Sequence, residues 1–325
     1  MFKASSMKAI QVREFGDSSV LVYRDVERPQ PGPAEVLLRV FAAGVNPADW
    51  YARAGFPAIP EEMRPQLTLP FIPGSDVSGV VEKVGSEVTK FREGDSVFGL
   101  VRFPQLNNGG KSYAEFVTAP EAHLALKPEN IDHLHAAATP MAALTAYQYL
   151  FDHAQLESNR NVLVNGAAGG VGHFAAHFAK MKGANVIGVA SGRHERFLRD
   201  LDVDVFVDYT STTVEELARD IDLVVDTVGG PQGYRFLSVV KPGGTISPVF
   251  LGEYHRSRAK ELGISFKGGQ VHSDGTQMVE IARLLQLGQI RTQIDSIYLL
   301  REASLAHQRG EKGHIQGKIV LQIAE

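Results

Sequence analysis

The 325-residue sequence contains no cysteine. This absence rules out disulfide bonds, thiolate-ligated zinc, iron–sulfur clusters and catalysis by a cysteine nucleophile. Every chemistry that depends on a thiolate is therefore excluded.

Long apolar runs and dense basic clusters are also missing. No segment approaches ~18 consecutive apolar residues, and the start MFKASSMKAIQ lacks the apolar stretch of a signal peptide. Lys and Arg number 33 against 37 Asp and Glu, and no basic cluster is long enough to follow a phosphate backbone. We therefore expect a cytoplasmic protein that binds neither membranes nor nucleic acid.

The chain has the composition of a folded protein, with 44% hydrophobic and 22% charged residues. Its length exceeds the ~100 to 200 residues usual for one domain. Two domains with separate cores are expected.

The residue pattern changes near Ile131. Residues 7–127 contain short β-like runs separated by Gly and Pro, with irregular loops expected at Gly55–Pro73 and Leu100–Lys111. From Ile131 onward strands alternate with helices, which predicts a parallel sheet covered on both faces. Its expected strands are NVLVN, NVIGVA, DVFVDY, DLVVDTV and GTISPVF. After Gly269 we expect one helix, GTQMVEIARLLQLG, and a closing strand, GKIVLQI.

A glycine-rich turn follows the first of these strands. It has the strand-before, helix-after context of a dinucleotide fingerprint, in which small residues let the backbone approach a pyrophosphate at a helix N-terminus. A tight packing corner without a ligand is the alternative. The candidate cofactor residues in the turn are Gly166, Ala168, Gly169, Gly170, Val171 and Gly172.

The end of the second strand indicates which dinucleotide binds. NAD-binding domains usually place Asp or Glu there, but this chain has Ser191, Gly192 and Arg193, with no acid before Glu195. A hydroxyl and a guanidinium would hold a 2′-phosphate, which a carboxylate would repel. The pattern favours NADPH, although an Arg opening a solvated helix remains an alternative.

His173 and His177 form an i, i+4 pair that invites a metal hypothesis. No Glu lies between them as in a hydrolytic zinc site, and the helix is expected to pack its other face on the sheet. We assign no metal to this pair.

Several motifs, taken in order, carry a resemblance to a known family. They are Gly44-Val-Asn46-Pro-Ala-Asp49-Trp-Tyr51, Pro73-Gly-Ser75-Asp76-Val-Ser-Gly79-Val-Val, Gly94-Asp-Ser-Val-Phe-Gly99, Tyr113-Ala-Glu-Phe116, the glycine turn, and His314-Ile-Gln-Gly317-Lys318-Ile-Val-Leu321. From Met7 to the C-terminus the chain resembles the zinc-independent quinone oxidoreductase branch of the medium-chain dehydrogenase/reductase superfamily. This resemblance implies an α/β protein with a GroES-like β-rich catalytic domain (1–130 and 270–325) and a doubly wound parallel-sheet Rossmann domain (131–269).

The resemblance also bears on metals. Zinc-dependent members carry Cys at the position of Asn46 and His at the position of Ser75, and they have a cysteine-rich lobe without counterpart here. We therefore expect no metal site and a hydride transfer that needs positioning and one or two hydrogen-bond donors.

The resemblance implies roles for individual residues. Asn46 is expected beside the nicotinamide and its ribose, and Tyr51 as the donor that stabilises or protonates the enolate, with solvent as the alternative proton source. Asp49 is expected to fix the Asn46 loop. The remaining cofactor residues implied are Thr145 near the nicotinamide, Ser191 and Arg193 at the 2′-phosphate, Tyr209 by the adenosine, Thr227 at the sheet edge, Phe250 and Leu251 at the carboxamide, and Lys318 from the tail. Arg256 and Arg258 are alternative phosphate partners.

The sequence thus predicts an NADPH-dependent enzyme that reduces quinones or α,β-unsaturated carbonyls, and by family resemblance a homodimer. The pocket walls are expected from residues 56–71 and 103–108, where Phe56, Phe71 and Phe103 line a pocket or anchor their loops. Two rival hypotheses are an NADPH-binding sensor or structural protein without turnover, and a methyltransferase using S-adenosylmethionine. The missing ribose acid counts against the methyltransferase.

Overall fold

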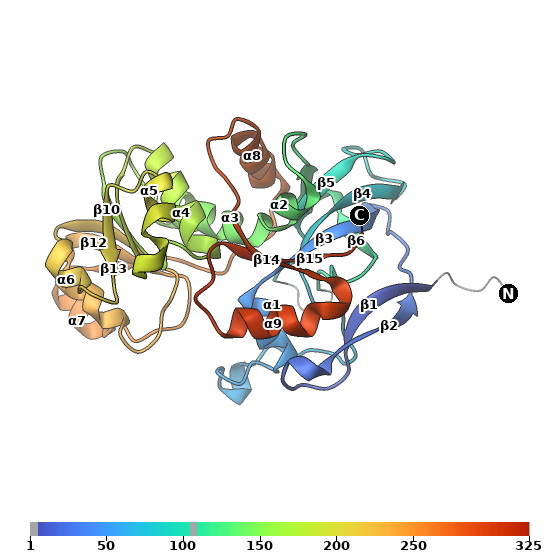
Figure 1. The fold of residues 1–325 in the computed structure, drawn as a ribbon, viewed down its shortest axis with the longest axis horizontal. Helices are drawn as coiled ribbons and strands as arrows, with labels where there is room; N and C mark the ends of the chain where they lie inside the picture. The colour runs from blue at the N-terminus through green and yellow to red at the C-terminus, as the bar shows by residue number, and fades with distance from the viewer. Residues whose placement is uncertain (1–5, 105–108, 325) are drawn as a thin grey trace.

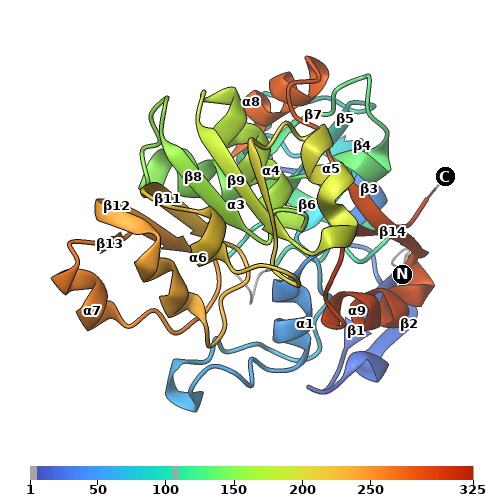
Figure 2. The same cartoon turned by 60° about the vertical axis from the view of Figure 1, so that its left-hand side comes forward.

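The computed structural model describes residues 6–104 and 109–324, which form two lobes (Figures 1 and 2). The predicted loop Leu100–Lys111 therefore falls partly outside the described residues, at 105–108. In the described part of the chain, no helix is long and apolar enough to cross a bilayer.

One lobe is built on a six-stranded parallel sheet with the order β10-β9-β8-β11-β12-β13. Its strands are β8 (Asn161–Asn165), β9 (Asn185–Ala190), β10 (Val205–Asp208), β11 (Ile221–Asp226), β12 (Val240–Pro248) and β13 (Ser265–Phe266). The chain runs outward from β8 to β10 and then returns to β11. The strand order therefore reverses between β8 and β11, where doubly wound sheets bind ligands at their carboxyl edge.

Both faces of this sheet are buried, as its unbroken apolar runs predict. Within β8, Val162 and Val164 pack with Phe174 on one face, while Leu163 packs with Phe236 on the other. The covering helices and turns are α3 (Pro140–Tyr147), the π-helical η5 (Gln148–His153), α4 (Gly170–Met181), η6 (Gly192–His194), α5 (Glu195–Asp200), α6 (Val214–Leu217), η7 (Gly233–Ser238) and α7 (Arg256–Glu261).

The other lobe contains a seven-stranded sheet with the order β14-β15-β3-β4-β5-β7, in which β6 also pairs with β3, and a separate β1–β2 hairpin. Its strands are β1 (Ser6–Val12), β2 (Leu21–Glu27), β3 (Glu35–Val45), β4 (Asp76–Val84), β5 (Ser96–Leu100), β6 (Phe116–Pro120), β7 (Leu124–Leu126), β14 (Ile294–Leu299) and β15 (Lys318–Gln322). Because β15 pairs with β3, the two ends of the chain build one domain.

Short helices flank this sheet. They are η1 (Ser18–Val20), α1 (Pro47–Arg53), η2 (Glu61–Met63), η4 (Glu121–His123), α2 (His133–Ala137), α8 (Gly275–Gln286), η8 (Leu300–Glu302) and α9 (Ala303–Glu311). Figure 1 shows α1 and α9, which are far apart in sequence, lying side by side.

The structure contains elements that the sequence pattern did not predict, among them β13, β14, α1, α7 and α9. β13 spans two residues, too few for a periodic signal. α9 contains Gly310, which is unfavourable in a helix but is needed where a Cβ would meet the Trp50 ring at 2.7 Å. Packing between elements explains these differences.

Candidate functional site

The glycine turn connects β8 to α4 at the point where the strand order reverses. Gly166 has a positive φ of 76°, and a Cβ there would meet the Thr227 Oγ1 at 2.5 Å. A Cβ on Gly172 would overlap the Gly166 carbonyl oxygen. The positive φ at Gly166 and the close backbone contact at Gly172 therefore require glycine at both positions.

Gly169 differs from these two glycines. It caps α4 with ordinary extended dihedrals, and a Cβ there would meet only the Gly166 oxygen, at 3.3 Å. In the part of the chain that the structure describes, no side chain caps the N-terminus of this 12-residue helix. The first-turn N–H groups and the helix dipole thus fit the diphosphate of a dinucleotide.

The C-terminal tail (residues 270–324) packs directly on the glycine turn. Gly317 N–H donates to the Ala168 carbonyl at 2.8 Å, and a Cβ on Gly170 would meet the Lys318 Cδ at 2.8 Å. The tail thereby joins the lobe that is built from the two chain ends to the glycine turn.

His173 and His177 have separate surroundings. The His173 Nδ1 lies 2.9 Å from the Gly169 carbonyl and its Nε2 accepts from Gln293 N–H at 3.4 Å, while burial lowers its pKa to about 3. The His177 Nε2 is buried without a partner among the described residues. Across residues 6–104 and 109–324, no group of three or more His, Cys, Asp or Glu side chains is placed to hold a metal ion.

Asn46 lies in a buried polar cluster before α1. Its Nδ2 donates to the Asp76 Oδ2 at 2.9 Å, and its Oδ1 accepts from the Lys318 ammonium. That ammonium also donates to the Val45 carbonyl at 2.9 Å and lies 3.8 Å from the Asp76 carboxylate. Burial raises the pKa of Asp76 and lowers that of Lys318. The orientation of the Asn46 amide is thus fixed from both sides.

Thr145 is connected to the same cluster. Its hydroxyl donates to the Met141 carbonyl at 2.7 Å, and Met141 N–H donates to the Asp76 Oδ1 at 2.7 Å. Asp76 therefore connects α3, where Thr145 lies, to Asn46 at the start of α1.

Asp49 accepts hydrogen bonds from Asn46 N–H at 2.8 Å and from the Tyr113 hydroxyl at 3.0 Å. Burial raises the pKa of Asp49 to about 7, against the opposing effect of these donors. The Tyr113 hydroxyl lies 3.3 Å from the His307 Nε2, and burial lowers the pKa of His307 to about 3. This buried network holds α1 against α9.

Tyr51 lies on α1 and stacks on Phe250, which follows β12, with 5.3 Å between ring centroids and 17° between planes. Burial raises the pKa of the Tyr51 phenol, which keeps it protonated as a donor at neutral pH. The Phe250 and Leu251 side chains are 38% and 61% exposed. By contrast, Phe71 and Phe103 pack against hydrophobic cores and anchor their loops.

The predicted 2′-phosphate residues gather around the tail. Arg193 donates to the His314 carbonyl at 2.5 Å and to the His194 Nε2 at 3.0 Å. The Tyr209 hydroxyl lies 3.4 Å from the His314 Nδ1, and the Ser191 hydroxyl oxygen is buried without a partner among the described residues.

A carboxylate also lies at this loop: Asp208 accepts a hydrogen bond from Gly192 N–H at 2.9 Å. Sequence reasoning assigned no role to His314, because only folding brings the tail to this loop.

Thr227 contributes mainly to the shape of the turn. Its hydroxyl donates to the Asn165 carbonyl at 2.7 Å, immediately before Gly166. It therefore lies between the carboxyl ends of β8 and β11, as its place in the sequence predicts.

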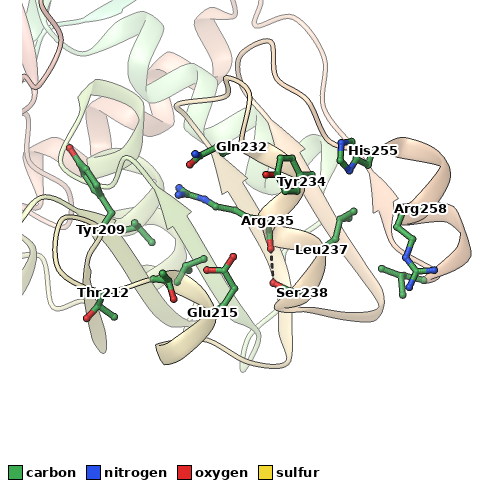
Figure 3. A pocket seen from close by; sticks show the side chains of 14 residues that line it. Tyr209, Thr212, Glu215, Gln232, Tyr234, Arg235, Leu237, Ser238, His255 and Arg258 are labelled. Atoms are coloured by element: carbon green, nitrogen blue, oxygen red, sulfur yellow. Dashed lines mark hydrogen bonds between the residues drawn. The ribbon is translucent and has the colours of Figure 1, made fainter.

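A pocket of about 950 Å³ adjoins this region, between α6, η7 and α7 (Figure 3). Tyr209 and Arg235 lie on its wall, and the Arg235 Nη2 is 3.4 Å from the Asn165 Oδ1. Sequence reasoning missed Arg235, since no motif marks it. Arg258 also lines the pocket but pairs with Glu261 at 2.7 Å, while Arg256 lies over the Phe266 ring.

Comparisons with known proteins agree with this architecture. Residues 32–129 match the alcohol dehydrogenase GroES-like domain, and residues 201–321 match the zinc-binding dehydrogenase family. The chain is 34% identical to a 2-methylene-furan-3-one reductase of Solanum lycopersicum, covering 98% of this chain and 79% of the relative. It is 32% identical to a quinone oxidoreductase of Sus scrofa, covering 93% of each. A solved quinone oxidoreductase from Coxiella burnetii superposes with a TM-score of 0.87 at 32% identity, covering 98% of this chain and 100% of that one.

A GroES-like domain together with a Rossmann domain that carries such a turn defines a two-domain oxidoreductase with a nicotinamide cofactor. The chain belongs to the zinc-independent quinone oxidoreductase branch of the medium-chain dehydrogenase/reductase superfamily. The fold predicted from the sequence is confirmed.

Proposed function

We propose that this protein is an NADPH-dependent oxidoreductase that transfers hydride to quinones or α,β-unsaturated carbonyls without a metal. The observation that carries the NADPH assignment is the grouping of Arg193, Tyr209 and His314 beside the Ser191 hydroxyl, which has no partner among the described residues. Of the five N–H donors in the Arg193 guanidinium, two have partners among the described contacts, which leaves donors for a phosphate.

Metal independence is proposed from the donor set around Asn46. The side chains here are an amide, carboxylates and the Lys318 ammonium, which already contacts the Asn46 oxygen and the Val45 carbonyl. A second cation at this oxygen would be repelled by the ammonium. Asn46 is therefore assigned to position the bound nicotinamide rather than to ligate a metal.

Each residue then has a defined part. Bound NADPH would supply the hydride. Gly169, Gly170 and Val171 would hold its diphosphate at the start of α4, and Lys318 keeps the Asn46 amide in a fixed orientation. The Tyr51 phenol is the proposed donor to the substrate oxygen, where negative charge develops.

The substrate class is proposed from the relatives. Those relatives are named as reductases of quinones and of a 2-methylene-furan-3-one, and both kinds of acceptor carry a carbonyl conjugated to a carbon that can accept hydride.

We also propose a homodimer joined along the exposed edge of β13, which sedimentation velocity would test.

The decisive assay is NADPH oxidation against matched quinones, enones, enals and saturated aldehydes, repeated with NADH. We expect turnover with the conjugated acceptors alone and a preference for NADPH. Binding of NADPH without oxidation of any acceptor would instead favour a sensor or structural protein.

Arg193→Ala tests the cofactor preference. Loss of a charge-assisted contact should weaken NADPH binding roughly ten- to hundredfold, measured by titrating NADPH fluorescence, and leave NADH binding unchanged. Arg199→Ala is the matched control, because Arg199 lies on α5 and pairs with Glu195 at 2.6 Å. Equal losses for both coenzymes in Arg193→Ala would contradict the assignment.

A further inference from the structure

The Tyr51–Phe250 pair is an aromatic contact between the two domains. Tyr51 belongs to α1 of the catalytic domain, whereas Phe250 follows β12 of the Rossmann domain. Their planes are inclined by only 17°, so two flat faces meet nearly parallel. Such a contact leaves the exposed part of each ring available to another flat molecule.

The backbone that carries Phe250 is fixed on both sides. Val249 N–H donates to the Asp226 carbonyl, Gly230 N–H to the Leu251 carbonyl, and Glu253 N–H to the Gly230 carbonyl, each at 2.9 Å. Phe250 as a residue nevertheless remains 38% exposed. A rigid segment thus presents a partly uncovered ring to Tyr51.

Tyr51 also contacts Trp50, with an edge-on geometry and 6.0 Å between ring centroids. Trp50 in turn packs edge-on against His307 at 6.1 Å. Because His307 belongs to the buried network between α1 and α9, the Tyr51 ring is also attached to a fixed support.

We propose that Phe250 is a specificity-determining residue which, with Tyr51, selects flat cyclic acceptors, namely quinones, over acyclic enones and enals. This inference rests on the proposed hydride transfer and names the preferred class of acceptor. A quinone ring that covers the exposed part of the Phe250 ring beside Tyr51 adds an aromatic stack to the existing pair, and its electron-poor face suits these electron-rich rings. An acyclic enone lacks a ring and covers both side chains incompletely.

The direct test compares Phe250→Leu, which keeps the apolar bulk, with Phe250→Tyr, which keeps the ring. In Phe250→Leu we expect kcat/KM to fall about three- to tenfold for 1,4-benzoquinone and 1,2-naphthoquinone, and by less than about twofold for methyl vinyl ketone and 2-hexenal. Phe250→Tyr should retain the wild-type ratio of quinone to enone activity. Tyr23→Leu, at a 42% exposed tyrosine on β2, is the control and should change neither value.

A binding measurement separates this inference from catalysis. Trp50 is the only tryptophan in the chain, so quenching of its fluorescence by 1,2-naphthoquinone reports binding beside Tyr51 without any cofactor. Half-saturation should require about three- to tenfold more quinone in Phe250→Leu than in the wild type. N-acetyltryptophanamide corrects for collisional quenching.

The outcomes are distinguishable. Equal losses for quinones and acyclic enones, unchanged Trp50 quenching, or a Phe250→Tyr variant that behaves like Phe250→Leu would each overturn the role of Phe250. If the wild type oxidises NADPH with neither class of acceptor, the proposed function fails, and the Trp50 titration still decides whether quinones bind at this aromatic pair.

Discussion

Lys318 is the residue on which the arrangement around Asn46 depends. Its ammonium is the counter-charge of Asp76, whose side chain is completely buried. Removal of one member of a buried ion pair leaves the other charged and unpaired, which is strongly destabilising.

Lys318→Met should therefore lower the free energy of unfolding by about 3–5 kcal/mol, measured by urea denaturation. The double variant Lys318→Met/Asp76→Asn removes the stranded charge and should recover part of this loss. A single variant as stable as the wild type would show that Asp76 is not charged in the fold.

The raised pKa of Asp49 predicts that the stability of the protein depends on pH. The pKa of this carboxyl is raised from 3.8 to about 7 by burial, so folding favours the protonated carboxyl. The contribution of the Asp49 carboxyl to the free energy of unfolding is complete below about pH 4 and is lost as the pH rises through 7. Asp49→Asn should thus gain stability relative to the wild type between pH 4 and 7, by up to about 4 kcal/mol. Urea unfolding of both proteins at pH 4.5, 6 and 8 measures the difference, and a constant difference would contradict the shift.

The sequence singled out individual residues of the candidate site but not the contacts between them. Asn46, Tyr51 and Lys318 stood in recognisable motifs, but the contacts of Lys318 with Asn46 and Asp76 join distant parts of the chain. His314 stood in a motif without an assigned role and Arg235 stood in none, because their proximity to Tyr209 is created only by folding.

At the scale of elements, the turn before α4 separates two uses of glycine. Gly172 is required by the fold, because a Cβ would overlap the Gly166 oxygen, whereas a Cβ on Gly169 would meet one atom at 3.3 Å. If a diphosphate binds at the turn, it would occupy the space beside Gly169 that a Cβ would otherwise fill.

Gly169→Ala should therefore leave the free energy of unfolding within ~0.5 kcal/mol of the wild type but weaken NADPH binding roughly tenfold or more. Gly172→Ala should lower stability by about 1–3 kcal/mol or more. Thermal denaturation and NADPH fluorescence titration provide the two readouts. Unimpaired NADPH binding by Gly169→Ala would place the diphosphate elsewhere.

Elements with a clear apolar pattern were predictable, whereas α1 and α9 were not. The apolar run of β8 and the glycine turn after it identified the strand and the start of α4. α1 and α9 pack on each other through Trp50, Gly310 and His307, and this tertiary contact compensates for their weak helical patterns.

At the scale of the whole molecule, the tail makes the two domains interdependent. Gly317 N–H donates to the Ala168 carbonyl, Gln293 N–H donates to His173, and Arg193 donates to the His314 carbonyl. These bonds connect the strands of the catalytic domain to both the glycine turn and the loop after β9. Unfolding of either domain breaks all of them.

We therefore expect the domains to unfold in one transition. Trp50 fluorescence reports the catalytic domain, since Trp50 is the only tryptophan, while far-UV circular dichroism reports both domains. The two melting curves should coincide, and NADPH at a hundred times its Kd should shift both upward together, by about 2.7 kcal/mol of added stability. His173→Leu, which removes the contact with Gln293, should reduce this coupling and separate the curves. Two separate transitions in the wild type, or a shift by NADPH in circular dichroism alone, would show that the tail does not transmit cofactor binding to the catalytic domain.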